Sequence, residues 1–225
     1  MPKKCVLILL DGLGDRSHES LRFITPLQAA QTPVLDSLSR CGENGLYHAT
    51  FSGQALPGET AHFLMFGYDI SAFPGRGPLE ALGAGNVLES NDVAVLAHFA
   101  CLKNENQILS LKEGKPKITD KEVDSLIQSV AEYETNGIRI CFNKTKGIYG
   151  ILTLCGEVSS QITDTDPIID GRPLSEVKSY ASAEHAYLAQ QTAMALKSYL
   201  VRAYQRLNIH PVNLFRSKKG LLTVN

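Results

Sequence analysis

The hydrophobic residues of this chain begin with one short, unbroken run and continue in strand-like and helical patterns. The first run, Cys5 to Leu10, has charged residues on both sides and ends at Asp11. Such a run is typical of a strand buried on both faces of an α/β sheet. These sheets place ligands at the carboxyl ends of their strands, which makes Asp11 a candidate site residue. The alternative is a core strand that ends in a solvated aspartate and a turn.

The next segments predict a β-loop-α-β arrangement. Thr32 as the N-cap, Pro33 in the first turn and Gly42 after the last turn predict a short helix. Residues 45–51 return to a strand pattern.

Glycine and proline are concentrated in residues 52–85. Pro57 and Gly58 predict a turn, followed by a helix that begins near Glu59. The free amides and positive dipole end of such a helix suit a phosphate group.

Three side chains in this stretch are candidates for chemistry. Thr60 provides a hydroxyl, His62 a titratable ring, and Arg76 a planar fork for a carboxylate or phosphate. Each also has an ordinary explanation: a helix-start residue, a hydrogen-bonded core histidine and a surface ion pair, respectively.

The middle of the chain predicts a small α+β unit. Its expected elements are a strand at 93–102, a turn at 104–106, a strand at 108–111, a helix with a capping box formed by Thr119 and Glu122, and strands at 138–142 and 148–154.

Two features stand out towards the C-terminus. Asp164 and Asp166 flank a threonine before Pro167, a pattern that fits either a ligand cluster or a turn. Residues 183–207 predict a long helix, and residues 221–225 predict the start of a strand. The helix carries a core stripe made of Leu188, Ala195, Tyr199, Ala203 and Leu207.

Composition narrows the class of protein. The 225 residues allow one large domain or two small ones, and 44% hydrophobic with 20% charged residues is typical of a globular protein. The net charge of -1 contains no long run of one sign, so we expect neither a nucleic-acid nor a membrane partner. No apolar stretch reaches the length of a membrane span, and the first run is too short for a signal peptide. Five scattered cysteines without a C-x-x-C pair indicate reduced thiols and a cytoplasmic location.

Several motifs occur together in one order. They are DGLGD at 11–15, TPLQAAQTPVLDSL at 25–38, PGETAHFLMFGYD at 57–69, GRGPLEALGAG at 75–85, ITDTDP at 162–167 and HPVNLFRSKKGL at 210–221. This order resembles the cofactor-independent phosphoglycerate mutases of the archaeal type, in the alkaline phosphatase superfamily. The resemblance is dense up to residue 85 and weaker through the middle.

The resemblance implies an α/β fold: an alkaline-phosphatase-like three-layer α/β/α core with an inserted small α+β domain. The core would comprise residues 1–87 and 166–225 and be incomplete at its C-terminus, with the insert at 88–165. It also implies phosphoryl transfer between 3-phosphoglycerate and 2-phosphoglycerate, helped by a divalent metal (Mn, Mg or Zn) that activates a hydroxyl and neutralises phosphate. The predicted site comprises Asp11 as metal ligand, Thr60 as catalytic hydroxyl, and His62, Arg76, Asp164 and Asp166 as substrate-binding residues.

The sequence departs from the family at the nucleophile. The family pattern resembles P-G-S-D-T-A-H, and this chain reads PGETAH, so the serine has no counterpart. Gly58 then takes its place, and Thr60 is offset by two positions, about 200° around a helix. A gapped alignment would restore Thr60, and Ser52 is a further alternative.

Two other departures concern charge and length. Arginines expected in the insert are replaced at residues 95–97, 114–115 and 148–149, where Lys115 is the one cation. The family's remaining metal ligands lie in motifs beyond residue 225, so we expect an incomplete metal site.

Three functions therefore compete. The first is a phosphoglycerate mutase-like enzyme acting on a small phosphorylated substrate. The second is a non-catalytic, truncated or degenerate homologue, whose unfinished sheet would associate with a second copy or a partner chain. The third is a hydrolase of another phosphate ester.

Overall fold

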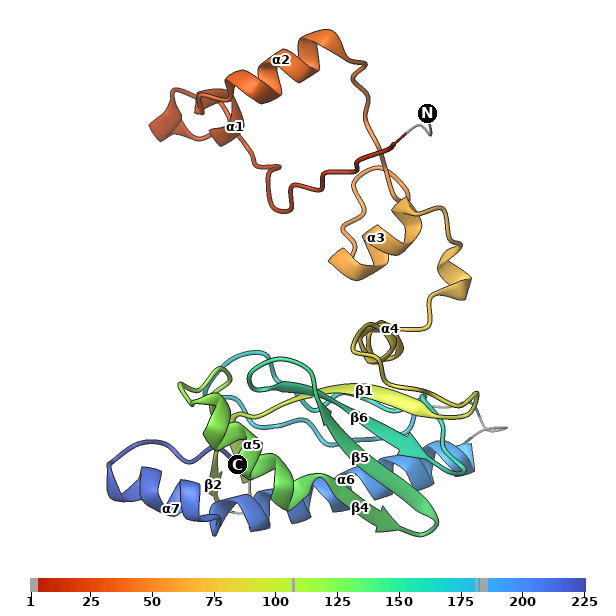
Figure 1. Ribbon diagram of the computed structural model, residues 1–225, viewed down its shortest axis with the longest axis vertical. Helices are drawn as coiled ribbons and strands as arrows, with labels where there is room; N and C mark the ends of the chain where they lie inside the picture. Colours follow the sequence, from red (N-terminus) through yellow and green to blue (C-terminus); the bar gives the residue numbers. More distant parts are fainter. Residues whose placement is uncertain (1–3, 107, 181, 183–185) are drawn as a thin grey trace. The chain divides into compact units, whose positions relative to one another are not determined.

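The computed structural model describes residues 4–106, 108–180, 182 and 186–225. The chain divides into two compact units, Met1–Leu56 (unit 1) and Pro57–Asn225 (unit 2). Figure 1 shows the elements of both units.

Unit 1 consists of short helices joined by extended chain. A 3-10 turn, η1 (Glu19–Leu21), precedes α1 (Pro26–Ala29) and α2 (Pro33–Cys41). α1 begins with a capping box in which Thr25 and Gln28 each accept a hydrogen bond from the backbone amide of the other. The helix predicted between Thr32 and Gly42 is confirmed by α2, because proline presets the first turn and glycine follows the last one.

The two strands predicted in unit 1 are not formed, and this part of the prediction is wrong. Residues 5–10 belong to no strand, and Val6 and Ile8 are 79% and 72% exposed. Residues 45–51 also contain no strand, and Leu46 is 92% exposed. An apolar run becomes a buried strand only where other strands pair with it, because its backbone groups need hydrogen-bond partners. The described part of unit 1 supplies no such strand.

Unit 2 opens with α3 (Gly58–Met65), the turn η2 (Ile70–Ala72) and α4 (Arg76–Gly83). α3 confirms the helix that was predicted to begin near residue 59. α4 packs closely on strand β1 (Val93–His98), and Gly77 makes this approach possible. A Cβ atom at that position would collide with the carbonyl oxygen of Ala94.

A four-stranded antiparallel sheet forms the centre of unit 2. Its strands are β1, β4 (Glu132–Thr135), β5 (Ile138–Lys144) and β6 (Tyr149–Cys155), in the order β1-β6-β5-β4. A separate hairpin joins β2 (Cys101–Glu105) and β3 (Ile108–Glu113). The predicted hairpin and the strands predicted at 138–142 and 148–154 are confirmed. The single strand predicted at 93–102 is divided into β1 and β2, and β4 was not predicted.

Helices cover both faces of the sheet, as the alternation of side chains along each strand requires. On one face Leu152 and Leu154 pack in a core with α5 (Asp120–Val130) and α6 (Ala186–Asn208). On the other face Ala94 and Ile151 pack against Ala81 of α4. Unit 2 thus has helices, sheet and helix in three layers (Figure 1).

Both α5 and α6 had been predicted. The Glu122 amide donates to Thr119 Oγ1 (3.3 Å), and the Thr119 amide donates to Glu122 Oε2 (2.9 Å), which confirms the capping box. The hydrogen bond from that backbone amide is the main reason why the pKa of Glu122 is lowered. α6 confirms the long helix from residue 186 onward, while residues 183–185 lie outside the described residues. Tyr199 and Leu207, two members of its predicted stripe, are buried.

The end of the chain is held by a buried asparagine on α7 (Pro211–Lys218), a helix that was not predicted. Asn213 Nδ2 donates to the carbonyl oxygens of Leu207 (2.8 Å) and Val224 (2.6 Å), and Asn213 Oδ1 accepts from the Val224 amide (2.8 Å). The strand predicted at 221–225 is wrong. This segment is irregular. The side chains of Asn213 and Arg216 bond the backbone of Val224 and Leu222, and the Asn225 amide donates to the carbonyl oxygen of Ala100.

The predicted limits of the inserted domain at 88–165 stay a prediction. Both sheets lie within residues 93–155, yet α6 packs on the four-stranded sheet from outside those limits. The fold thus ties the segment after 165 to the same core.

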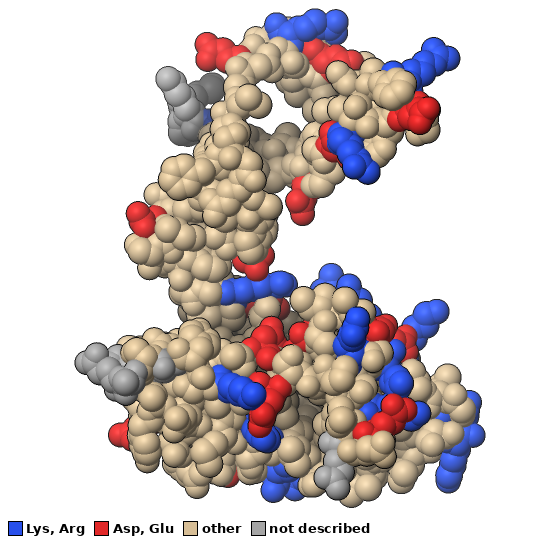
Figure 2. All heavy atoms as spheres, turned by 180° about the vertical axis from the view of Figure 1, so that it is seen from behind, with Lys and Arg blue, Asp and Glu red and all other residues tan. Residues whose placement is uncertain are grey.

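The surface of unit 2 carries mixed charge. Figure 2 shows blue and red side chains interspersed on the face of unit 2 that is in view. Among the residues that the structure describes, none of the helices has both the length and the hydrophobicity needed to span a bilayer.

Candidate functional site

Asp11 lies in unit 1, at the end of the exposed segment 5–10. Gly12 follows with φ of 72°, a conformation that glycine adopts without strain, and turns the chain. Four residues after Asp11, Asp15 Oδ2 lies 3.1 Å from His18 Nε2, and Asp15 Oδ1 accepts a hydrogen bond from the amide of residue 16. The contact with His18 is the main reason why the pKa of Asp15 is lowered. The predicted acidic turn is present, but without a buried strand before it.

Thr60 and His62 lie on α3 in unit 2. The N-cap residue Pro57 gives this helix no side-chain cap, so its first amides remain available as hydrogen-bond donors. Thr60 is 8% exposed and His62 is half-buried. A Cβ atom placed at Gly58 would meet no atom of the surrounding chain within 4 Å. The first turn of α3 therefore has room for a ligand or a larger side chain.

Arg76, Asp164 and Asp166 line a large hollow in unit 2, which Thr60 and His62 do not line. Its volume is about 2500 Å³. Its walls come from β1, from the segment 156–166 and from α6, and "the hollow" below refers to this space. The structure thus divides the predicted site residues into three groups: unit 1, α3 and the hollow.

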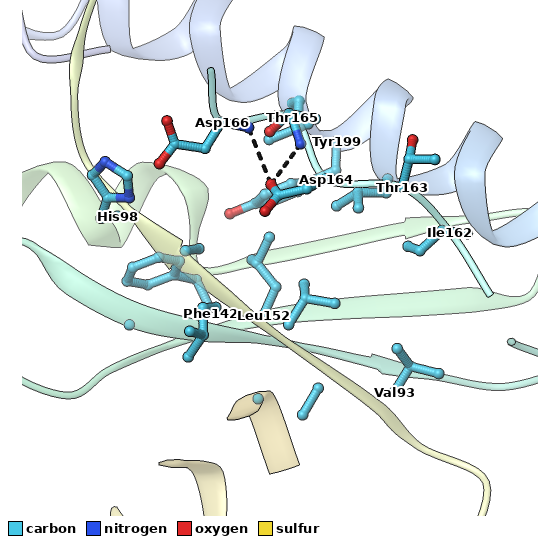
Figure 3. A pocket seen from close by; sticks show the side chains of 18 of the residues that line it. Val93, His98, Phe142, Leu152, Ile162, Thr163, Asp164, Thr165, Asp166 and Tyr199 are labelled. Carbon is cyan, nitrogen blue, oxygen red and sulfur yellow. Dashed lines mark hydrogen bonds between the residues drawn. The ribbon is translucent and has the colours of Figure 1, made fainter. Parts of the chain in front are cut away.

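The two predicted aspartates form a turn at the rim of the hollow. Asp164 Oδ1 accepts hydrogen bonds from the amides of Thr165 (2.6 Å) and Asp166 (3.0 Å), and Asp166 Oδ1 accepts from the Ile168 amide (2.7 Å). The turn that this motif allows is therefore present, and its role as a ligand cluster stays a prediction. Both side chains are exposed, and in Figure 3 they lie over the side chains of Phe142 and Leu152.

Arg76 contacts a carboxylate of its own helix. Arg76 Nε lies 3.7 Å from Glu80 Oε2, and Thr145 Oγ1 donates to Glu80 Oε1 at 3.3 Å. The Arg76 side chain is 58% exposed. Its guanidinium therefore retains donors that face solvent.

The positions where arginines were expected, apart from Ile148, line the same hollow. Val95, Leu96 and Ala97 of β1 contribute apolar walls, and Lys115 and Tyr149 lie elsewhere on the lining. The hollow consequently lacks arginine forks at these places and has hydrocarbon and one ammonium group instead.

The described residues do not by themselves complete the predicted metal site. Within residues 4–106, 108–180, 182 and 186–225, no three side chains among histidine, cysteine, aspartate and glutamate are grouped so that they could hold a metal ion. A divalent cation needs several ligands, and Asp11 supplies one carboxylate. The metal remains an expectation from the family resemblance alone.

The sequence reasoning missed the pair formed by His98 and Tyr149. These residues end β1 and begin β6, and the register of the sheet places them opposite one another. Their ring centroids are 5.9 Å apart, and both rings line the hollow. Polar and aromatic residues at strand ends were the signal available in the sequence. The pairing of the two strands could not be read from it.

Comparison with known proteins places this chain within a class. A cofactor-independent phosphoglycerate mutase from Thermoplasma acidophilum DSM 1728 has a similar structure, with a TM-score of 0.57 and 30% sequence identity. The match covers 96% of this chain and 55% of that chain. The predicted α/β fold class with an alkaline-phosphatase-like core is thereby confirmed.

Sequence comparison then shows the family. The family model described as "2,3-bisphosphoglycerate-independent phosphoglycerate mutase" matches residues 39–213. The chain is 37% identical to 2,3-bisphosphoglycerate-independent phosphoglycerate mutase 1 of Methanocaldococcus jannaschii, covering 99% of this chain and 53% of that protein. It is 35% identical to a similarly named protein of Methanopyrus kandleri, and the match covers 98% of this chain and 52% of that protein. The chain belongs to the 2,3-bisphosphoglycerate-independent phosphoglycerate mutase family, and it spans about half the length of these curated relatives.

Proposed function

We propose that this chain takes part in phosphoryl transfer between 3-phosphoglycerate and 2-phosphoglycerate. The observation that carries the proposal is the 37% identity, over 99% of the chain, to a protein named as a phosphoglycerate mutase. The substrate is then a small phosphorylated acid. All five cysteines are free, as is usual for proteins in a reducing cytoplasm. We propose that the protein works in this compartment.

The start of α3 supports this proposal in physical terms. Uncapped amides at a helix N-terminus attract phosphate oxygens through hydrogen bonds and the helix dipole. Thr60 is the hydroxyl in this turn, and we propose it as the phosphoryl acceptor. Because Thr60 is 8% exposed, it is less accessible than the open position at Gly58.

The remaining predicted residues have proposed roles that follow from their chemistry. Arg76 would hold a phosphate or carboxylate through its solvent-facing donors, and His62 would exchange a proton. Asp164 and Asp166 would accept hydrogen bonds from the glycerate hydroxyl, since their charge repels the anionic ends of the substrate.

The experiment compares two changes in the first turn of α3. Replacement of Thr60 with valine keeps the shape of the side chain and removes the hydroxyl. We expect conversion of 3-phosphoglycerate to fall by roughly 100-fold or more, as losing a nucleophile does. Intact-mass spectrometry after incubation with 3-phosphoglycerate should show one phosphoryl group on the wild type and none on Thr60→Val.

Gly58→Ser tests the position where the family serine would stand. The open space at Gly58 accepts the new side chain, so this variant should fold and acquire a phosphoryl group at residue 58. Gly45→Ser is the matched control, because a Cβ atom at Gly45 also meets nothing within 4 Å. Equal conversion by the wild type and Thr60→Val, with no phosphoryl adduct on either, would contradict the proposed role of Thr60.

The expected metal is tested separately. We propose Asp11 as one of its ligands, so Asp11→Asn should bind less Mn²⁺ than the wild type in equilibrium dialysis. Asp36→Asn, another exposed acid of unit 1, should bind as the wild type does. Equal binding by all three proteins would remove Asp11 from the site.

A second candidate function rests on the exposed apolar side chains of unit 1. Val6, Ile8, Val34 and Leu46 are each more than 70% exposed. Surface of this kind favours association, so we propose a non-catalytic homologue that assembles with itself or a partner chain as the alternative. Sedimentation velocity should then show concentration-dependent association, and a monomer at every concentration would count against assembly with itself.

A further inference from the structure

Two of the five cysteines lie on neighbouring strands of the four-stranded sheet. Cys141 of β5 is paired with Thr153 of β6, and Cys155 of β6 is paired with Arg139 of β5. Residues that are directly opposite each other, or two apart along one strand, project from the same face of a sheet. The two thiols therefore lie on one face, as diagonal neighbours across the two strands.

This face of the sheet is the one on which α4 packs. Ile151, which packs with Ala81 of α4, stands two residues before Thr153 on the same strand. Thr153 is 7% exposed, whereas Cys141 and Cys155 are both half-buried. Neither cysteine is sealed from solvent, so a small ion can reach the pair.

The diagonal spacing is too wide for a disulfide. Diagonal neighbours in an antiparallel pair have Cα atoms about 7–8 Å apart. A disulfide usually joins residues whose Cα atoms are about 4.4–6.8 Å apart. β5 and β6 are interior strands that are paired on both sides, so they cannot easily shift to close the difference. Both cysteines are accordingly free in the structure.

The same spacing suits an ion held between two sulfur atoms. A metal–thiolate bond is about 2.3 Å long, so a linear sulfur–metal–sulfur unit spans about 4.6 Å. With a Cβ–S bond added at each end, such a unit can bridge side chains at the diagonal distance. Thiolates select soft ions such as Cu⁺, which is stable with two sulfur ligands in line. This arrangement needs no third ligand, and the described residues contain no metal-binding group of three.

The charged neighbours suit the complex that would form. Two thiolates and one Cu⁺ together carry a single negative charge. A hydrogen bond between the Arg139 guanidinium and Cys155 is the main reason why the pKa of Arg139 is raised. Burial is the main reason why the pKa of both thiols, Cys141 and Cys155, is raised. The thiols therefore stay protonated until an ion displaces the protons, and Arg139 then faces the negative complex.

We propose that Cys141 and Cys155 bind one Cu⁺ ion between their sulfur atoms. Two S–H bonds break, two copper–sulfur bonds form, and both protons pass to solvent without any change of oxidation state. Arg139 is a positioning residue, because its guanidinium contacts the sulfur atom of Cys155. The site is separate from the proposed phosphoryl transfer, since Thr60 lies on α3 and Asp11 lies in unit 1.

The test measures the transfer of Cu⁺ from its coloured complex with bicinchoninate under anaerobic conditions. The wild type should withdraw one equivalent of Cu⁺. Cys141→Ser and Cys155→Ser should each bind roughly 100-fold more weakly or worse, because a single thiolate remains. The matched control is Cys5→Ser with Cys41→Ser, which removes two exposed thiols and should bind as the wild type does. Wild-type affinity in both single variants would overturn the proposal.

The role of Arg139 is tested in the same assay. Arg139→Gln should weaken Cu⁺ binding about tenfold, as the loss of an outer partner of a metal ligand does. Arg139→Lys keeps the positive charge and should restore most of the affinity. Arg40→Gln, which removes an exposed arginine of unit 1, is the matched control. Equal affinity of the wild type and Arg139→Gln would contradict the positioning role.

A measurement on the wild type alone does not depend on how the variants fold. Iodoacetamide labelling, read by peptide mass spectrometry, should show that Cu⁺ protects Cys141 and Cys155 and leaves Cys5 and Cys41 reactive. Protection of Cys5 or Cys41 in place of the pair would overturn the proposal. So would a disulfide between Cys141 and Cys155 that forms readily in mild oxidant, because the sulfur atoms would then lie closer together than the diagonal spacing allows.

Discussion

Leu9 in unit 1 and Leu154 in unit 2 belong to similar apolar runs but differ in burial. Leu9 is 43% exposed, and Leu154 is fully buried. Leu154 belongs to β6, which has β1 on one side and β5 on the other. The run around Leu9 has no paired strand in the described part of unit 1. Burial of an apolar run is therefore decided by its neighbours and not by its own hydrophobicity.

The comparison extends to the whole of each unit. All the buried hydrophobic residues of the described chain lie in unit 2. Burial of apolar area is the main favourable term in folding. We therefore expect the free energy of unfolding to reside in unit 2, and matched substitutions in the two units can test this.

The largest difference should come from shortening one leucine in each unit. Leu154→Ala should lower the free energy of unfolding by about 2–5 kcal/mol, because it leaves a cavity in the core. Leu9→Ala should change it by less than about 0.5 kcal/mol. Urea titration followed by circular dichroism measures both. A cost for Leu9→Ala similar to that of Leu154→Ala would mean that residues 5–10 are buried in solution.

Cysteine reactivity should differ between the units by roughly 100-fold. Burial raises the pKa of the Cys101 thiol in unit 2 to about 11, whereas Cys5 and Cys41 of unit 1 are exposed. At pH 8 little Cys101 is thiolate, the reactive form, and this fraction grows as the pH rises towards 11. Ellman's reagent should label Cys5 and Cys41 first. In concentrated urea all three should react alike, and fast labelling of native Cys101 would contradict the buried position.

Removal of an asparagine from each unit should give the next effect. Asn213→Ala leaves two carbonyl oxygens and one amide without their partner, so it should cost about 2–3 kcal/mol. Asn44 of unit 1 donates to the Ser39 carbonyl oxygen at the surface, where water can replace it, and Asn44→Ala should cost less than about 0.5 kcal/mol. Thermal unfolding of the two variants provides the comparison. Equal melting temperatures would show that Asn213 is not needed to hold the chain end.

The smallest expected effect concerns the two capping boxes. Thr119→Ala removes the cap of α5 and should cost about 1 kcal/mol, while Thr25→Ala at α1 should leave global unfolding unchanged. The lowered pKa of Glu122 adds a pH dependence. Its stabilisation is fully present above the unfolded pKa of 4.5 and is lost as the pH falls through the lower folded pKa. Denaturation at pH 7 and pH 3 should show a smaller gap between wild type and Thr119→Ala at pH 3.

Local signals in the sequence predicted α2, α3, α5 and α6, whereas α1, α4 and α7 were not predicted. Thr119 with Glu122 and Thr32 with Pro33 mark helix starts through contacts within four residues, so α5 and α2 were found without knowledge of the rest of the fold. α7 was missed although Pro211 stands in its first turn. Residues 210–212 had been interpreted only as the end of the preceding long helix.

Strands and sites depend on residues that are distant in the sequence. Residues 5–10 have a strand-like pattern but no partner, whereas β4 has charged residues at every second position and still pairs with β5. The walls of the hollow come from β1, the segment 156–166 and α6. No single segment of the sequence could therefore predict it. The acids at 164 and 166 were recognised from their motif. Their place on the lining of the hollow depends on the fold of the whole unit.

The close contact at Gly77 fixes the position of α4 on the sheet and, with it, the position of Arg76. Because nothing but backbone separates this turn of α4 from β1, the helix has no freedom to slide along the strand. The backbone of the neighbouring Arg76 is therefore held in a fixed position on the sheet. A single methyl group added at residue 77 would push α4 away from β1 and move Arg76 away from the rim of the hollow.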